Sequence, residues 1–188
     1  MPRLIVGISG STGPHYGVRL LEVLREHRPD IETHLILSSG ARTTINYEMA
    51  RDPDSVTALA HTLHDERNVG ASIASGTFVT EGMVVAPCSM KSLSAIANSY
   101  NDNLIARAAD VCLKERRRLV LVVRETPLHL GHLRLMAQVT EAGGVVLPPV
   151  PGFYHRPQTI QDVIDQTVTK ILDLFGIHVD IIQRWQGI

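Results

Sequence analysis

Residues 4–16, LIVGISGSTGPHY, join an apolar run to glycines and hydroxyls, and a helical pattern follows at once. This is the sequence form of a strand, a tight turn and a helix N-terminus. Gly7, Gly10 and Gly13 permit positive φ and close backbone approach beside the unpaired N–H groups of the helix. The spacing is neither G-x-G-x-x-G nor a P-loop. Two interpretations stay open, a phosphate-binding turn and an ordinary strand-to-helix turn.

Short apolar runs rich in Val, Ile and Leu recur along the chain, with amphipathic segments between them. Because the runs are continuous rather than alternating, we expect strands that are buried on both faces, as in a parallel sheet. We therefore predict an α/β fold, a Rossmann-like or flavodoxin-like three-layer sandwich with a mostly parallel sheet. The predicted strands are residues 4–8, 33–37, 83–86, 119–123 and 145–147, and the predicted helices are residues 16–26, 41–50, 55–65, 93–97, 103–117, 130–141 and 163–175.

The length and charge of the chain limit the kinds of protein it can be. A chain of 188 residues fits a single domain, residues 1–188, with a core of its own. We expect residues 176–188 to form an apolar tail that packs on the domain or on a neighbouring subunit. The formal net charge of −1 is spread over mixed acids and bases, so neither nucleic acid nor an anionic membrane is an expected partner.

The two cysteines, Cys88 and Cys112, lie far apart and form no C-x-x-C motif, which fits a reducing compartment. No apolar run approaches the ~18 residues of a membrane span, and the first residues lack a signal-peptide layout. We expect a cytoplasmic protein. No base is identifiable for Cys88, so it is interpreted as a small core residue, with Ser89 beside it as the ligand contact.

Two pairs of histidines have a spacing of three residues, His61 with His64 and His129 with His132. On a helix this spacing would put two imidazoles on one face. No third ligand has a matching spacing, so no metal site is expected, and helix capping or packing is the favoured role.

Polar residues follow the predicted strands where each one ends. Since ligands of open parallel sheets bind outside the carboxyl ends of the strands, these residues predict one shared crevice. Arg124 and Glu125 directly follow a buried strand, which favours a phosphate or flavin-ring contact for Arg124 over a simple ion pair. Glu125, Glu48 and Lys114 form a possible acid/base set, although each on its own is equally a surface charge.

From residue 83 onward the chain reads APCSMKSLSAIANSYNDNLIARAADVCLKERRRLVLVVRETPLHLGHLRLM and then LPPVPGFYHRPQT. These long motifs closely resemble the UbiX-like flavin prenyltransferases, a family formerly labelled as aromatic or phenolic acid decarboxylases, and the resemblance covers essentially the whole chain. It implies a flavoprotein, usually a dodecamer, that transfers a dimethylallyl group from dimethylallyl phosphate to N5 and C6 of reduced FMN. The product, prenylated FMN, would serve a UbiD-type decarboxylase. No metal is implied.

The resemblance also implies roles for single residues of this chain. Cations and hydroxyls are needed around a departing phosphate, and ring closure at C6 needs an acceptor for one proton, such as Glu48, Glu125 or the phosphate itself. The implied FMN contacts are Gly10, Ser11, Thr12, Ser38, Ser89, Met90, Lys91, Ser92 and Arg124. The implied prenyl-phosphate contacts are Arg107, Tyr154 and Lys170, and the implied catalytic residues are Glu48, Lys114 and Glu125.

Three departures from the family pattern bear on activity. Thr12 stands where the turn commonly has a serine, so the hydroxyl is kept but its rotamers are restricted. Pro14 and His15 after it are unusual, although Pro is well tolerated at the first helical position. Lys170 stands where relatives often have Arg, which gives a point charge instead of a two-pronged guanidinium. Altered prenyl transfer is an expected consequence.

Two other functions compete with prenyl transfer. One is an FMN-binding carrier that supplies an aromatic acid decarboxylase without chemistry of its own, and the other is a flavoprotein that oxidatively decarboxylates a peptidyl cysteine. A carrier needs no prenyl-phosphate pocket, so the implied phosphate contacts favour the enzyme. The segment LPPVPGFYHRPQ matches the prenyltransferases and gives no support to the peptidyl-cysteine decarboxylase.

Overall fold

The computed structural model describes residues 1–187, and its strands form one parallel sheet. The strand order β3-β2-β1-β4-β5-β6 is that of a doubly wound sheet whose direction of winding reverses between β1 and β4. Every paired strand runs parallel to its neighbours, so the predicted fold class is confirmed. The strands are β1 (Arg3–Ile8), β2 (Glu32–Leu37), β3 (Thr62–His64), β4 (Gly82–Cys88), β5 (Arg118–Val123) and β6 (Val145–Val146).

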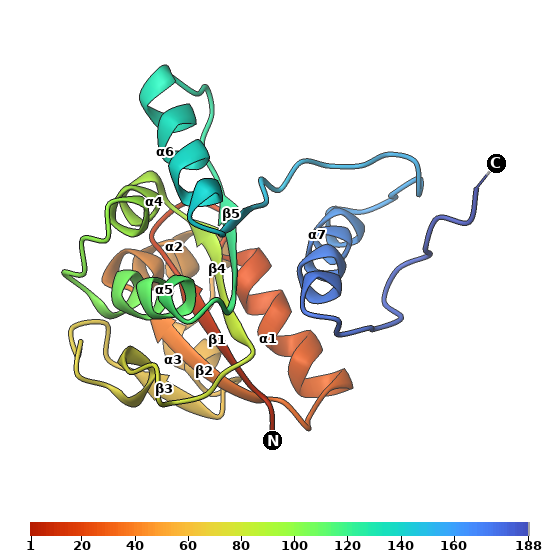
Figure 1. Cartoon of the computed structure of the whole chain (residues 1–188). Coiled ribbons are helices and arrows are strands. Elements are labelled where there is room, and N and C mark those ends of the chain that lie inside the picture. The colour runs from red at the N-terminus through yellow and green to blue at the C-terminus, as the bar shows by residue number, and fades with distance from the viewer. Residues whose placement is uncertain (188) are drawn as a thin grey trace.

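Helices cover both faces of the sheet. In Figure 1, α1 and α7 lie on one side of the strands and α4 and α5 on the other, while the far end of α6 projects beyond them. This arrangement is the predicted three-layer sandwich. The helices are α1 (His15–His27), α2 (Ser39–Met49), α3 (Pro53–Thr57), α4 (Met90–Ala97), α5 (Leu104–Lys114), α6 (Leu130–Glu141) and α7 (Ile160–Leu174), with a short 3-10 helix, η1 (Ser72–Ala74).

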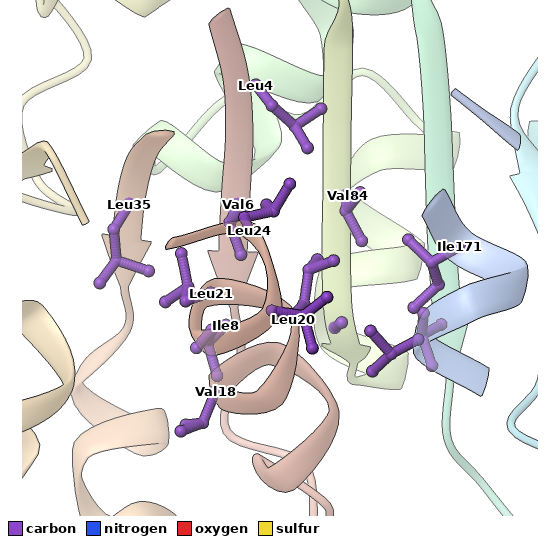
Figure 2. Packing of buried hydrophobic residues seen from close by; sticks show 14 of the residues in the cluster. Leu4, Val6, Ile8, Val18, Leu20, Leu21, Leu24, Leu35, Val84 and Ile171 are labelled. Carbon is purple, nitrogen blue, oxygen red and sulfur yellow. The ribbon is translucent and has the colours of Figure 1, made fainter. Parts of the chain in front are cut away.

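Successive side chains of a strand point to opposite faces of the sheet, so the strands contribute to two separate cores. Leu4 on β1 belongs to the cluster beneath α1 and α7, whereas the next residue, Ile5, belongs to the cluster beneath α4 and α5. Figure 2 shows Leu20 and Leu21 of α1 beside β1 and β4, with Ile171 of α7 on the far side of β4. Fully burying one such side chain stabilises the fold by about 1.5–3 kcal/mol. The two cores pack against both faces of the sheet.

The turn after β1 depends on glycine at two positions. Gly13 has φ +89°, a left-handed conformation that side chains disfavour. A Cβ on Gly10 would lie 2.9 Å from the Cα of Gly40, so the turn touches the start of α2 backbone to backbone. Pro14 takes the N-cap position of α1 and offers no side-chain hydrogen bond to the helix.

The predicted helix over residues 55–65 is wrong. Helix α3 ends at Thr57, and the chain then enters β3, which pairs with β2. Asp52 caps α3 correctly, accepting from Asp54 N at 3.0 Å, but the pairing of β3 with β2 replaces the rest of the helix. Residues 67–81 are largely irregular, and η1 is the only helix described among them.

The first part of the C-terminal segment packs against the domain. Ile177 and Val179 are buried in the core beneath α1 and α7. Arg184 donates two hydrogen bonds of 2.9 Å to Asp173 of α7. Ile188 lies outside the described residues. Within residues 1–187 no helix combines the length and the apolar character that crossing a bilayer requires.

Candidate active site

The carboxyl ends of β1 and β4 are joined by the side chain of Ser9. Its hydroxyl donates to the carbonyl of Pro87 at 2.8 Å and accepts from the backbone N–H of Ser89 at 2.8 Å. This is the point where the winding of the sheet reverses, so ligands are expected here. Two cavities open beside this point, and a third adjoins the second of them.

The first cavity, which we call the switch-point cavity, has a volume of about 570 Å³. It brings together five residues predicted to contact FMN. Sequence reasoning missed its other polar walls, which come from residues after β3 and before α5. The five predicted residues are Gly10, Ser38, Ser89, Lys91 and Ser92, and the missed residues are Glu66, Arg67, Asp102 and Asn103.

Three helices begin at the switch-point cavity, each capped by a polar side chain. Ser38 accepts from Ala41 N at 3.0 Å at the start of α2, and Ser89 accepts from Ser92 N at 3.3 Å at the start of α4. Asn103 accepts from Ala106 N at 3.0 Å at the start of α5. Helix N-termini carry partial positive charge and free N–H groups, so this donor set suits a phosphate.

The second cavity, the turn cavity, measures about 420 Å³ and contains Thr12, Arg124 and Glu125. Neighbouring backbone holds Arg124 in place: its N–H donates to Cys88 O at 3.2 Å, and its carbonyl accepts from the Ser11 hydroxyl at 3.2 Å. The predicted residues Ser11, Thr12, Arg124 and Glu125 therefore lie together.

Two further side chains shape the turn cavity. Burial raises the pKa of Tyr16, which lines it, and the charge of Arg124 opposes that rise. Glu48 reaches across from α2, and its Oε2 accepts from the N–H of Gly13 at 2.9 Å. The predicted catalytic carboxylate is thus hydrogen-bonded to the turn.

The third cavity, the tail cavity, has a volume of about 530 Å³ and lies between the Pro-rich segment, α7 and the C-terminal tail. Tyr154 and Lys170 both line it, as predicted for a shared phosphate site. Trp185 of the tail meets Tyr154 edge to face, with ring centroids 5.7 Å apart. Sequence reasoning treated Trp185 only as a packing residue. Val150 lines both this cavity and the turn cavity, so the two adjoin.

Two predicted residues lie apart from the three cavities. The guanidinium of Arg107 donates to Ala74 O at 3.2 Å and to Asp110 Oδ2 at 3.3 Å, so it is turned toward η1. Lys114 is the last residue of α5, about 15 Å along the helix axis from the end at the switch-point cavity. It forms an ion pair with Glu115. Within one protomer, neither Arg107 nor Lys114 lines the tail cavity that contains Lys170.

Met90 and the two cysteines play packing roles. The side chain of Met90 packs against the core beneath α4, while its backbone begins the helix at the switch-point cavity. Burial raises the pKa of Cys88 and of Cys112 to about 12, so both stay protonated at neutral pH. The interpretation of Cys88 as a core residue is confirmed.

The histidine pairs divide between capping and packing. His129 is the N-cap of α6 and accepts from Gly131 N at 3.0 Å, as the capping interpretation expects. His61 and His64 do not share a helix face, because residues 62–64 form a strand. No group of three His, Cys, Asp or Glu side chains suited to a metal ion occurs among residues 1–187.

Comparisons with known proteins agree with this geometry. The family model described as Flavoprotein matches residues 1–172. The Flavin prenyltransferase UbiX of Escherichia coli strain K12 is 60% identical over 189 residues, covering 100% of both chains. A crystal structure of AnUbiX (PadA1) in complex with FMN and dimethylallyl pyrophosphate has a TM-score of 0.96 and 49% identity, covering 99% of this chain and 98% of that one. The dodecameric FMN-dependent Ubix-like decarboxylase from Escherichia coli O157:H7 has a TM-score of 0.96 and 47% identity, covering 98% of this chain and 100% of that one.

Proposed function

The chain belongs to the UbiX-like flavin prenyltransferases of the Flavoprotein family, and on that premise we propose that it transfers a dimethylallyl group from dimethylallyl phosphate to N5 and C6 of reduced FMN. The observation that carries the proposal is the order of the three cavities. The turn cavity, with Thr12, Arg124 and Glu125, adjoins the tail cavity, with Tyr154 and Lys170. Gly10, at the start of the same turn, lines the switch-point cavity. This order supports two phosphate sites on either side of a central space.

The switch-point cavity fits FMN through its donor set. Three helix N-termini, several hydroxyls and the cation of Lys91 surround it, as a phosphate and a ribityl chain require. When bound, reduced FMN would supply the two nucleophilic ring positions that become prenylated. Arg124, fixed by backbone bonds at the neighbouring cavity, would hold the flavin by a charge-assisted contact.

The tail cavity fits an allylic phosphate because it combines a cation with apolar walls. Lys170 supplies the positive charge that a departing phosphate needs, and the Tyr154 hydroxyl supplies a hydrogen bond. Leu147, Val150 and Trp185 line the same cavity and suit a dimethylallyl group. Lys170 and Tyr154 would therefore stabilise negative charge on the leaving group while the apolar wall holds the reacting carbon.

Glu48 and Glu125 are our candidates for accepting the proton released at C6. Glu125 lines the turn cavity, and Glu48 is hydrogen-bonded to Gly13 in the same turn. Either side chain would accept the proton at a carboxylate oxygen. Arg107 and Lys114 can take part only if α5 of a neighbouring protomer supplies them, because within one protomer both are turned away from the tail cavity.

The wider setting follows from the same proposal. We expect one domain over residues 1–188 whose tail, residues 176–188, packs on the domain or on a neighbouring subunit, and residues 182–185 of this tail line the tail cavity. We expect a homo-oligomer, a dodecamer by likeness to the E. coli O157:H7 protein, in the cytoplasm. The prenylated FMN would pass to a UbiD-type decarboxylase.

The proposal is tested by anaerobic incubation with reduced FMN and dimethylallyl phosphate, followed by mass analysis of the flavin. We expect a flavin enlarged by one dimethylallyl group, and a parallel reaction with dimethylallyl pyrophosphate compares the two esters. If the protein bound FMN tightly but produced no enlarged flavin from either ester, the result would favour the FMN-binding carrier over the enzyme.

A further inference from the structure

Two acidic residues, Glu66 and Asp102, line the switch-point cavity, and the carboxylate of Glu66 lies at the start of a helix. Glu66 follows β3, and its Oε1 accepts from the N–H of Ser39, the first residue of α2, at 3.0 Å. Its carbonyl accepts from the N–H of Leu104, the first residue of α5, at 2.7 Å. One residue thus takes the first N–H of two of the three helices that begin at the switch-point cavity.

The third helix keeps its first N–H groups free. At the start of α4 the Ser89 side chain accepts from Ser92 N, and the N–H groups of Met90 and Lys91 have no hydrogen-bond partner among residues 1–187. The ammonium of Lys91 lines the same cavity. An incoming phosphate therefore finds two open N–H groups and Lys91 at α4, whereas at α2 only the Gly40 N–H is open among residues 1–187 and the first N–H is bound to the Glu66 carboxylate.

We propose that Glu66 controls how the site holds the FMN phosphate: its carboxylate reserves the N-terminus of α2, directs the phosphate to α4 beside Lys91, and keeps the phosphate affinity below the level that the three helices would give. The inference rests on the proposed binding of FMN. Two like charges inside a cavity of about 570 Å³ repel each other, and the repulsion is strongest where water is displaced. For an enzyme whose flavin product must leave, a weakened hold on the phosphate speeds release.

The variant Glu66→Gln isolates the charge. The amide oxygen of glutamine still accepts from Ser39 N, and the Glu66 carbonyl is unchanged, so α2 and α5 keep their contacts. The affinities for FMN and for riboflavin, which lacks the phosphate, are measured by flavin fluorescence. We expect FMN to bind about tenfold more tightly and to dissociate more slowly, while the riboflavin affinity stays within about twofold.

Asp65→Asn is the matched control. It removes the same charge from the neighbouring residue of the same loop, and asparagine keeps the bond that Asp65 Oδ1 accepts from Arg67 N at 3.0 Å. Asp65 does not line the switch-point cavity, so both flavin affinities should stay at the wild-type level.

Three outcomes decide the inference. FMN affinity that is unchanged or weaker in Glu66→Gln overturns it, and so does an equal tightening of FMN and riboflavin, which would mean that Glu66 acts on the shape of the cavity. Both results leave prenyl transfer standing. A wild-type protein that binds neither flavin would overturn the proposed function itself, together with this inference.

Discussion

Lys170 and Tyr154 both line the tail cavity, and Lys170 is the basic residue of the two. Its ammonium has no hydrogen-bond or ion-pair partner among residues 1–187, although Asp173 lines the same cavity. A cation without a partner at an apolar wall is available to a ligand phosphate. The neighbouring Arg184 is not, because Asp173 holds it through two hydrogen bonds.

Lys170→Ala should therefore impair the use of dimethylallyl phosphate without loss of FMN. Removing a charge-assisted bond costs about 1.5–3 kcal/mol, so KM for the ester should rise by roughly 10- to 150-fold. Lys170→Arg should restore or improve turnover, because a guanidinium binds two phosphate oxygens at once. Steady-state kinetics and an FMN titration check both variants. If Lys170→Ala lost FMN binding while its KM for the ester stayed unchanged, Lys170 would belong to the FMN site and not to the prenyl-phosphate site.

Arg124→Ala should weaken FMN binding by about 1.5–3 kcal/mol, the value of a hydrogen bond to a charged group. The backbone of Arg124 stays anchored to Cys88 and to Ser11, so the loop should keep its shape. Isothermal titration with FMN measures the change. Arg42→Ala, which removes an equal charge from the surface pair with Asp54, is the control. Equal FMN affinity in both variants would exclude Arg124 from the flavin site.

At the scale of the elements, β3 is a three-residue edge strand, and a histidine pair links it to β2. Nδ1 of His34 on β2 lies 2.9 Å from Nε2 of His64 on β3, and the two rings stack. Burial lowers the pKa of both imidazoles below the ordinary value of 6.5. Glu32 opposes the shift at His34, whereas Arg3 adds to it, and the Phe78 ring packs against His34 edge to face.

The histidine pair predicts a loss of stability in acid. Because the folded state keeps these imidazoles neutral, the unfolded chain binds more protons once the pH falls below about 6.5. Their contribution is therefore complete above that pH and is lost as the pH decreases. Urea unfolding from pH 8 to about 5 should show this loss, and His64→Gln should reduce it. If the free energy of unfolding decreased with pH equally in the wild type and in His64→Gln, the pH dependence would come from other groups.

The elements show what a single sequence can and cannot predict. The segment from β1 to α1 was predictable, since its apolar run, glycines and helix pattern act over neighbouring residues. Residues 58–65 contain helix-forming Ala and Leu, yet residues 62–64 pair with β2, where Thr62 lies opposite His34, 28 residues earlier in the chain. Long-range pairing of this kind overrides local propensity. Glu66 was missed for the same reason, because β3 carries it to the switch-point cavity.

At the scale of the whole molecule, most of the candidate site could be predicted from the residues that follow each strand. Parallel strands bring their carboxyl ends to one edge, so Ser38, Ser89 and Arg124 could be placed together without coordinates. Arg107 and Lys114 could not, because they lie on the flank of α5, and the chain alone does not indicate which surface meets another protomer. Their implied role with Lys170 requires an assembly.

Light scattering should give a mass well above the 20.7 kDa of one chain. Several large apolar side chains are exposed in the single protomer, among them Leu130, Leu133 and Phe153. Exposed apolar area of this kind is typical of contacts between protomers. A protein of one-chain mass at micromolar concentration would contradict the assembly and leave Arg107 and Lys114 without a role.

A site shared between protomers makes a further prediction, since Lys170 and Lys114 would then reach one prenyl phosphate from different chains. Lys114→Ala and Lys170→Ala should each abolish most activity when assembled alone. When the two variants are expressed together and assemble at random, about a quarter of the sites should combine an intact Lys170 from one protomer with an intact Lys114 from its neighbour. Prenylation should recover to about that fraction of the wild-type rate. If both lysines served the same protomer's site, no mixed assembly would contain an intact site, and activity would stay at the level of the separate variants.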